Sequence, residues 1–214
     1  NEEMRLYNAT MKINRLELLK ANIGLELVAG YDELDKYTGQ ILTDRAKEEL
    51  ERQAGIFGNT VENLSQRAGE IAAASFNVAT YSDRIWTHQA MLKSEIDNLL
   101  REGMIQGRNP RVLARHLEKR FGVSRSNAVR LMRTELARVQ TEAQKESYER
   151  NGYEMYEYIA EPTACPICKA WNGNTYSVKD MTVGENAPPM HPNCRCSTAA
   201  YMDRTEFEEW LRRQ

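Results

Sequence analysis

The chain has 214 residues, with 29 Lys and Arg against 31 Asp and Glu, and a formal net charge of −2. Its 41% hydrophobic and 28% charged residues are typical of a folded globular protein, and its 12 Gly and 6 Pro exclude collagen-like and low-complexity chains. No apolar run approaches the roughly 18 residues that a membrane span needs, and the first residues do not resemble a signal peptide. We therefore expect no membrane association and a reducing compartment.

The charge is unevenly distributed along the chain. Residues 1–100 carry 11 basic and 16 acidic residues, residues 101–151 carry 12 and 6, and residues 152–214 carry 6 and 9. The middle segment is therefore the part of the chain that favours contact with a polyanion.

The first hundred residues are expected to form long helices. Apolar residues recur at three- and four-residue spacing from Leu16 to Leu27, which places them on one helix face. We expect this helix to end at Gly30, and two further helices to cover 42–55 and 60–78. The apolar faces favour a helical bundle core, with a partner-binding surface as the alternative.

The middle of the chain predicts three more helices. The first covers 83–105, the second begins at Asn109-Pro110 and ends at Gly122, and the third begins at Ser124 or Ser126 and ends at Asn151-Gly152. The last two resemble a helix-turn-helix, and an ordinary helical hairpin is the alternative. Four arginines are candidates for non-specific contact with DNA phosphates, namely Arg125, Arg130, Arg133 and Arg138.

The character of the sequence changes at residue 153. Apolar or aromatic residues alternate with Glu from Tyr153 to Ile159, which predicts a half-exposed strand. Asp203–Glu206 resembles a capping box, which predicts a C-terminal helix within 201–214. The predicted fold is mainly α, with a long-helix N-terminal region and a small zinc-bound β-rich C-terminal module, which makes the chain α+β.

The most specific motif is a cluster of cysteines with one histidine. Cys165-Pro-Ile-Cys168 precedes His191-Pro-Asn-Cys194-Arg-Cys196, so all four cysteines and one of the three histidines lie within 32 residues. A C-x-x-C turn supplies two thiolates, and the distal segment supplies two further ligands for a tetrahedral Zn²⁺. Five candidates compete for four positions: Cys165, Cys168, His191, Cys194 and Cys196. The sequence does not decide which of them is spare.

Two alternatives compete with a structural zinc site. The cysteines can be buried free thiols or disulfides, or they can belong to a metal- or thiol-dependent enzyme. Catalysis by a cysteine needs an orienting group and an oxyanion hole, and the spacing supplies neither as well as it supplies a zinc knuckle. A structural Zn²⁺ is favoured because a segment as short as 153–200 cannot bury a large core alone.

Several motifs together resemble those of a known family. In chain order they are Tyr81-Ser-Asp-Arg-Ile-Trp86, Asn109-Pro-Arg-Val-Leu-Ala-Arg115, Arg133-Thr-Glu135, the C-x-x-C motif, Trp171-Asn-Gly173 and His191-Pro-Asn-Cys-Arg-Cys196. This order is similar to that of phage minor head, or head morphogenesis, proteins related to the phage Mu F protein. The resemblance covers about residues 81–200, and the terminal His-Pro-Asn-Cys-Arg-Cys is its most specific part.

The resemblance implies a structural virion protein without enzymatic activity. Such a protein associates with the portal protein and other head proteins inside the capsid, after assembly in the host cytoplasm, and serves head assembly or DNA delivery. A nucleic-acid-binding zinc module that contacts packaged double-stranded DNA is the alternative function. The expected domains are a helical N-terminal extension (1–80), a helical Mu F-like core (81–151), a zinc-binding β-rich module (152–200) and a C-terminal helix (201–214).

Overall fold

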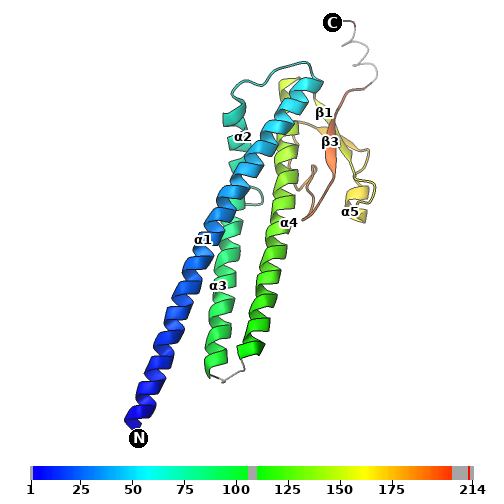
Figure 1. The fold of residues 1–214 in the computed structure, drawn as a ribbon. Helices are drawn as coiled ribbons and strands as arrows, with labels where there is room; N and C mark the ends of the chain where they lie inside the picture. The colour runs from blue at the N-terminus through cyan, green and yellow to red at the C-terminus, as the bar shows by residue number, and fades with distance from the viewer. Residues whose placement is uncertain (1, 106–109, 204–211, 213–214) are drawn as a thin grey trace. The chain divides into compact units, whose positions relative to one another are not determined.

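The fold of this chain was analysed in a computed structural model that describes residues 2–105, 110–203 and 212. Most of these residues are helical, and a small antiparallel sheet follows the last long helix (Figure 1). The elements are α1 (Glu2–Ile56), α2 (Leu64–Ala73), α3 (Tyr81–Ile105), α4 (Pro110–Arg150), β1 (Met155–Ile159), α5 (Pro166–Lys169), β2 (Thr175–Ser177) and β3 (Ser197–Tyr201). The expected mainly α fold with a small β-rich C-terminal module is confirmed. The predicted C-terminal helix falls almost entirely outside the described residues.

The chain divides into two compact units. Unit 1 consists of Asn1–Tyr37 and Ser82–Val129, and unit 2 of Thr38–Tyr81 and Arg130–Gln214. The helices α1 and α4 contribute one part to each unit. The sheet and the cysteine cluster belong to unit 2.

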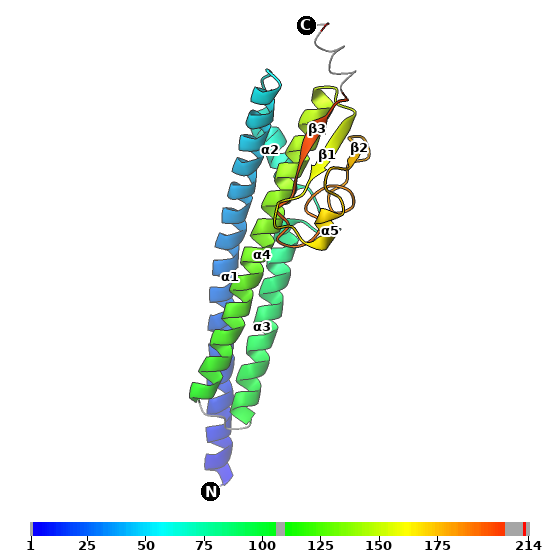
Figure 2. The ribbon, with the colours of Figure 1, turned by 90° about the vertical axis from the view of Figure 1, so that its right-hand side faces the viewer.

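Unit 1 is helical, and α3 and the first part of α4 run alongside the first part of α1 (Figures 1 and 2). Its buried cluster consists of Leu27 from α1 with Leu92 and Ile96 from α3, and Ile23 packs against it. The C-terminal end of the predicted apolar stripe therefore forms core, as the three–four spacing indicated.

The predicted helix end at Gly30 is wrong, because α1 continues through this residue to Ile56. A glycine inside a helix costs about 1 kcal/mol relative to alanine, which is too little to end a helix on its own. Neither a proline nor a left-handed residue follows Gly30, and both are common where a helix stops. The predicted end at Gly55–Gly58 is confirmed, since Gly58 has a positive φ of 69°.

The predicted break at Gly122 is also wrong, so the chain has neither a helix-turn-helix nor a helical hairpin here. Helix α4 runs without interruption from Pro110 to Arg150. The two serines expected to cap a new helix have other partners. The Ser126 hydroxyl donates to the Gly122 carbonyl one turn earlier, and the Ser124 hydroxyl lies 2.5 Å from the Tyr31 hydroxyl.

The helical core of unit 2 lies between α1, α2 and α4. Its fully buried members are small or branched aliphatic residues, namely Leu42, Ala46, Leu50, Ala68, Ile71, Ala72, Val139 and Ala143. The helix predicted over 60–78 is shorter in the structure, because α2 covers only Leu64–Ala73. Asn77 and Val78 have positive φ angles of 48° and 59°, which a right-handed helix does not accommodate.

Helix α4 ends where the sequence predicted. Gly152 has a φ of 72°, and the Tyr153 amide donates to the Tyr148 carbonyl at 3.0 Å while the Gly152 amide donates to the Glu149 carbonyl at 3.2 Å. This pair of bonds is a Schellman motif, which satisfies the last carbonyls of a helix and turns the chain away. It directs the chain into β1.

The sheet has the strand order β2-β1-β3, and both pairings are antiparallel. In the central strand, the side chains of Tyr156 and Tyr158 are completely buried, whereas Glu157 between them is partly exposed. The predicted half-exposed strand is therefore confirmed, but it begins at Met155 instead of Tyr153, and Ile159 at its end is exposed. Tyr156 packs with Tyr148 of α4, and Tyr158 packs with the buried cysteines.

Candidate metal centre

The first pair of predicted ligands lies on a tight helical turn that follows β1. Cys165 is the N-cap residue of α5, Pro166 occupies the first helical position, and Cys168 lies one turn further on. The Lys169 amide donates to the Cys165 carbonyl at 3.0 Å, which closes the turn. Proline suits this position because its φ is already helical and its missing N–H would have no partner there. The C-x-x-C spacing thereby places both sulfurs on one side of the turn.

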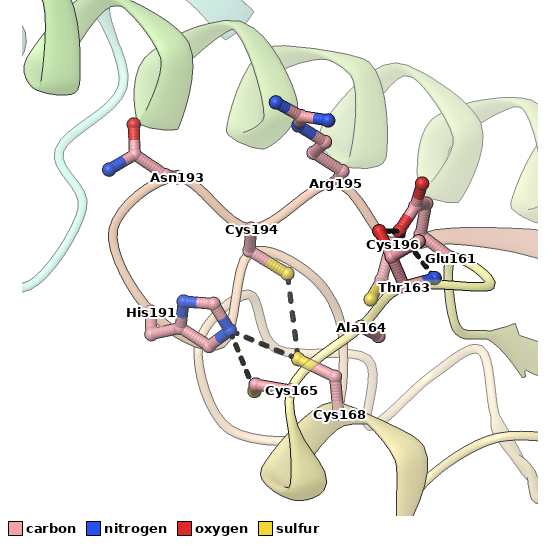
Figure 3. Close-up of a pocket in the computed structure, with 10 residues that line it drawn as sticks. All are labelled: Glu161, Thr163, Ala164, Cys165, Cys168, His191, Asn193, Cys194, Arg195 and Cys196. Atoms are coloured by element: carbon pink, nitrogen blue, oxygen red, sulfur yellow. Dashed lines mark hydrogen bonds between the residues drawn. The ribbon is translucent and has the colours of Figure 1, made fainter.

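The second group of predicted ligands comes from the segment that leads into β3. The Cys194 amide donates to the His191 carbonyl at 3.1 Å, and Asn193 has a left-handed φ of 62°. The Asn193 amide also donates to the Thr134 hydroxyl of α4 at 3.2 Å. This turn directs His191 and Cys194 toward α5 (Figure 3).

The side chains of the two segments meet. The His191 Nε2 atom lies 3.2 Å from the Sγ atoms of both Cys165 and Cys168, and the Sγ atoms of Cys168 and Cys194 are 3.7 Å apart (Figure 3). In a tetrahedral zinc site, Zn–S bonds of about 2.3 Å and Zn–N bonds of about 2.0 Å imply ligand atoms about 3.5–3.8 Å apart. The observed separations are close to this range.

The five candidate ligands form two overlapping triads that share Cys168. One triad joins Cys165, Cys168 and His191, and the other joins Cys168, Cys194 and Cys196. In each triad the donor atoms lie within 4.8 Å of one another. Three thiols and an imidazole, or four thiols, are donor sets that Zn²⁺ prefers, so the residues present fit this ion.

The imidazole of His191 is oriented for metal binding. Its Nδ1 atom lies 2.9 Å from the Pro192 carbonyl oxygen, which can only accept a hydrogen bond. Nδ1 therefore carries the proton, and the lone pair of Nε2 is directed at the two thiols of α5. A backbone carbonyl that fixes the tautomer in this way is common behind a metal-bound histidine.

The thiols differ in their surroundings. Cys168, Cys194 and Cys196 are buried with Tyr158, and Trp171 and Met190 pack against them, whereas Cys165 is partly exposed. The Cys168 backbone amide lowers the pKa of the Cys165 thiol, and burial raises the pKa of the Cys168 thiol. A cluster of protonated thiols in such an apolar environment gains little, whereas a bound cation compensates for burying thiolates.

The hydroxyl of Tyr158 is also directed at the cluster. It is buried and has no hydrogen-bond partner among the described residues, and its polar neighbours are the thiols of Cys168 and Cys196. A phenol donates a stronger hydrogen bond to a metal-bound thiolate than to a neutral thiol. This otherwise unpaired group is a second observation that fits thiolates bound to a cation.

The other histidines do not take part. His88 lies on α3 and His116 on α4, both in unit 1. Among the described residues, neither belongs to a cluster of side chains suited to bind a metal.

The structure separates the four candidate DNA-contacting arginines. Arg125, Arg130 and Arg133 are exposed on α4. Arg138 is only 1% exposed, so its assignment as a DNA-facing residue is wrong. Its guanidinium pairs with the buried Glu135 at 2.7 Å and donates to two backbone carbonyls at the end of α2, those of Ile71 and Ala72.

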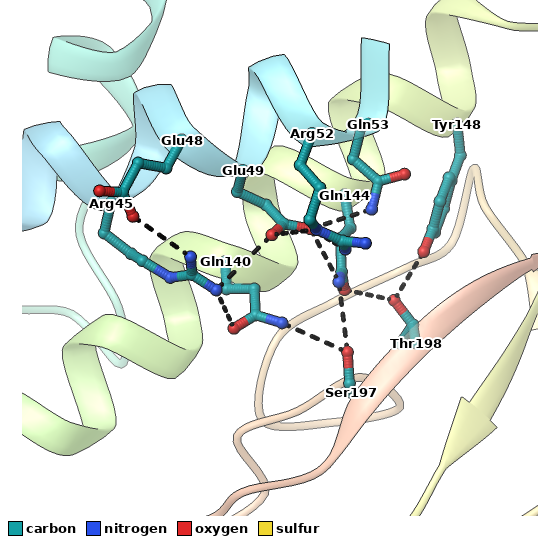
Figure 4. A network of polar contacts seen from close by, with 10 residues as sticks. All are labelled: Arg45, Glu48, Glu49, Arg52, Gln53, Gln140, Gln144, Tyr148, Ser197 and Thr198. Atoms are coloured by element: carbon teal, nitrogen blue, oxygen red, sulfur yellow. Dashed lines mark hydrogen bonds and ion pairs between the residues drawn. The ribbon is translucent and has the colours of Figure 1, made fainter. Parts of the chain in front are cut away.

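A polar network that was not predicted from the sequence links strand β3 to the helices of unit 2 (Figure 4). At its centre the fully buried Glu49 carboxylate accepts hydrogen bonds from Arg52, Gln53 and Gln144. The Gln144 side chain also accepts a hydrogen bond from the Thr198 hydroxyl at 2.8 Å. Glu49 and Gln144 lie on different helices, 95 residues apart in the chain, so local sequence patterns do not predict their contact.

This network holds the strand that follows the metal cluster. Ser197 and Thr198 come directly after Cys196, and the Gln144 side chain contacts both of their hydroxyls. The Thr198 hydroxyl also lies 3.2 Å from that of Tyr148. One end of the distal ligand segment is therefore fixed to α4 by contacts that do not involve a candidate ligand.

The described fold is that of a helical protein with a cysteine- and histidine-containing sheet module. Residues 94–199 match the family described as Phage Mu protein F like protein. This segment is thus a Mu F-like region, which confirms the resemblance to phage head morphogenesis proteins and is consistent with a structural protein of the virion that interacts with other head proteins. It includes all five candidate ligands. Comparison with curated proteins and with solved structures found no match.

The search for membrane spans was also negative. Within the described residues, none of the helices combines the length and the hydropathy that crossing a bilayer requires.

Proposed function

We propose that this chain is a minor capsid protein that associates with the portal vertex inside the phage head and aids head assembly or DNA delivery. The observation that carries the proposal is the Mu F-like region over 94–199, in which the ligand cluster occupies the most specific part of the motif pattern. The role of the cluster is proposed to be structural, because its ligand residues are part of the folded sheet module and three of the four thiols are buried.

The cluster is proposed to bind one structural Zn²⁺ through Cys165, Cys168, His191 and Cys194. The first three form one triad, and Cys194 is added because its sulfur lies 3.7 Å from that of Cys168. Cys196 is then the spare thiol, next to the Tyr158 hydroxyl. The bound ion supplies a cross-link between α5 and the segment before β3, which stabilises a module too small to rely on its own core.

The zinc assignment is tested by elemental analysis of the full chain purified under reducing conditions without chelators. We expect one zinc per chain, and about as much in Cys196→Ser as in the unmodified chain. Cys165→Ser and Cys168→Ser are expected to lose the ion. A folded unmodified chain that neither contains nor takes up zinc would contradict the assignment.

The location in the head is tested on phage particles that contain this chain. Quantitative mass spectrometry of purified particles is expected to find it in a few copies per particle, and chemical cross-linking is expected to join it to the portal protein. In assembling cells the chain would be found in the host cytoplasm before it enters heads. Absence of the chain from mature particles and from assembling heads would overturn the proposal.

Contact with packaged double-stranded DNA is a second candidate function, favoured by one observation. Arg125, Arg130 and Arg133 are exposed on the helix that carries the basic segment of the chain. Each phosphate neutralised by a protein cation adds about 0.9 to the slope of the logarithm of affinity against that of salt concentration. A mobility shift over a range of salt is expected to show a slope that decreases when Arg133 is changed to Gln. A slope near zero in the unmodified chain would exclude this function.

A further inference from the structure

The first part of α1 carries a heptad repeat on the face that points away from the core of unit 1. Its members alternate at spacings of three and four residues, and we call them the seam: Met4, Tyr7, Met11, Asn14, Leu18, Ala21, Leu25 and Val28. All but Asn14 are apolar or aromatic. Residues 4 and 28 bracket almost four heptads, which is the run length that indicates a coiled coil.

The seam is accessible to a partner. Leu18 is 64% exposed and Leu25 is 71% exposed, whereas Leu27, on the opposite side of the same helix, is 7% exposed and packs against Leu92. Since α1 already uses its other face for the core of unit 1, the seam is a second apolar stripe. Of its eight side chains, seven are exposed and one, that of Met11, is half-buried.

The beginning of α1 also has no tertiary support of its own. It extends past the end of α3 and the start of α4 (Figures 1 and 2). Over residues 2–15, every side chain is exposed except that of Met11, which is half-buried. Most of the stability of helices in proteins comes from tertiary packing of an apolar face, and this segment has little of it within the described residues. A second helix packed along the seam would stabilise this segment.

The period of the seam indicates what kind of partner fits it. A strict seven-residue repeat averages 3.5 residues per turn, so it stays in contact only with a helix that carries the same repeat and supercoils with it. The seam spans about 36 Å of helix at 1.5 Å per residue. This chain itself supplies such a helix.

We propose that the seam binds the seam of a second copy of this chain in a parallel, in-register coiled coil. Asn14 is the residue that favours a second copy of this chain as the partner and a parallel orientation of the two helices. In a parallel, in-register pair, each Asn14 faces the Asn14 of the other copy, and the two amides can hydrogen-bond to each other. An antiparallel pair with all layers filled would place Asn14 against Leu18 and leave the amide without a partner, which is costly in an apolar seam. A buried polar group favours the arrangement in which it has a hydrogen-bond partner.

The residues that flank the seam are compatible with the same arrangement. In a parallel pair, Glu3 and Glu17 face Asn8 and Asn22 of the second copy. Arg15 faces Thr10 by the same rule. No like charges oppose each other, so self-association meets no electrostatic barrier.

The proposal is tested on the full chain by sedimentation equilibrium over a range of concentrations. The unmodified chain is expected to form dimers, and the double variant Leu18→Glu/Leu25→Glu is expected to be monomeric. Ile13→Glu is the matched control, because Ile13 is 56% exposed on α1 but lies off the seam, and this variant is expected to remain dimeric. Circular dichroism verifies that all three proteins keep their helices.

The orientation is tested by a disulfide placed in the seam. Leu18→Cys is expected to cross-link to the same position of the second copy on mild oxidation, and peptide mass spectrometry distinguishes this link from any made by the native cysteines. A monomeric unmodified chain at every concentration would overturn the proposal. Equal disruption by Ile13→Glu, or cross-linking of position 18 only to other positions, would also overturn it.

Discussion

The hydroxyl groups of the two buried tyrosines of β1 have different neighbours. The Tyr158 hydroxyl faces the thiols of Cys168 and Cys196, whereas that of Tyr156 donates to the Asn186 carbonyl at 3.1 Å. Hydrogen bonds behind metal ligands commonly contribute 10- to 100-fold to metal affinity. We expect Tyr158→Phe to weaken zinc binding by about 10-fold, measured by competition with a chromophoric chelator.

The matched control for this prediction is Tyr156→Phe. It removes the same atom from the same face of the same strand, where the hydroxyl has a backbone partner. Zinc affinity should be unchanged, while the free energy of unfolding falls by about 1 kcal/mol. If the two variants bind zinc equally well, the Tyr158 hydroxyl has no role behind the ligands.

Arg138 shows that a buried charge can serve the fold instead of a partner. Its guanidinium neutralises Glu135 and caps the carbonyls of α2. Arg138→Met would remove the buried ion pair with Glu135 and the donors to the α2 carbonyls, and removing one member of a buried pair typically costs about 3–5 kcal/mol. Urea denaturation is expected to show a loss of this size. Arg133→Met on the exposed side of α4 should change stability by less than about 0.5 kcal/mol.

At the scale of the element, α1 and α4 are each longer than their sequences indicated. Local signals identified the helical segments and the ends of both helices at Gly58 and Gly152, where a positive φ requires glycine. Gly30 and Gly122 also predicted helix ends, but neither of them has a positive φ. What carries α1 and α4 through these positions is packing against other helices, which a single sequence pattern does not contain.

The interior glycines therefore predict a gain in stability on substitution. A Cβ atom at Gly30 or at Gly122 would meet nothing within 4 Å. We expect Gly30→Ala and Gly122→Ala each to raise the free energy of unfolding by about 0.5–1 kcal/mol, measured by urea denaturation. Gly152→Ala is the contrasting variant, because its φ of 72° strains any other residue, and it should be destabilising. A loss of stability in the first two variants would show that these glycines are needed where they are.

At the scale of the whole molecule, the meeting of the candidate metal ligands was the feature that the sequence predicted best. Each half of the site is local, since Cys165 and Cys168 share one turn and His191 and Cys194 share another. The sequence shows such a turn directly, as a short spacing between two potential ligands. The supports of the site were not predicted, because Glu49, Gln144 and Thr198 meet only through the fold.

Some parts of unit 2 pack on the candidate ligands and others do not, and this difference predicts how each part responds when metal is removed. The helical core of α1, α2 and α4 contains no candidate ligand, whereas Tyr158 of β1 packs directly on the cysteines. With a chelator, we expect the backbone amides of β1, β2 and α5 to lose protection from hydrogen exchange, while those of α1 from Leu42 to Leu50 keep it. Strand β3 should respond less, because the Gln144 network holds it to α4.

Adding Zn²⁺ back should restore protection, and Cys165→Ser should resemble the chelated protein before any treatment. If protection of β1 and α5 is unaffected by complete loss of the ion, the packing of Tyr158, Trp171 and the thiols is sufficient to hold the module folded.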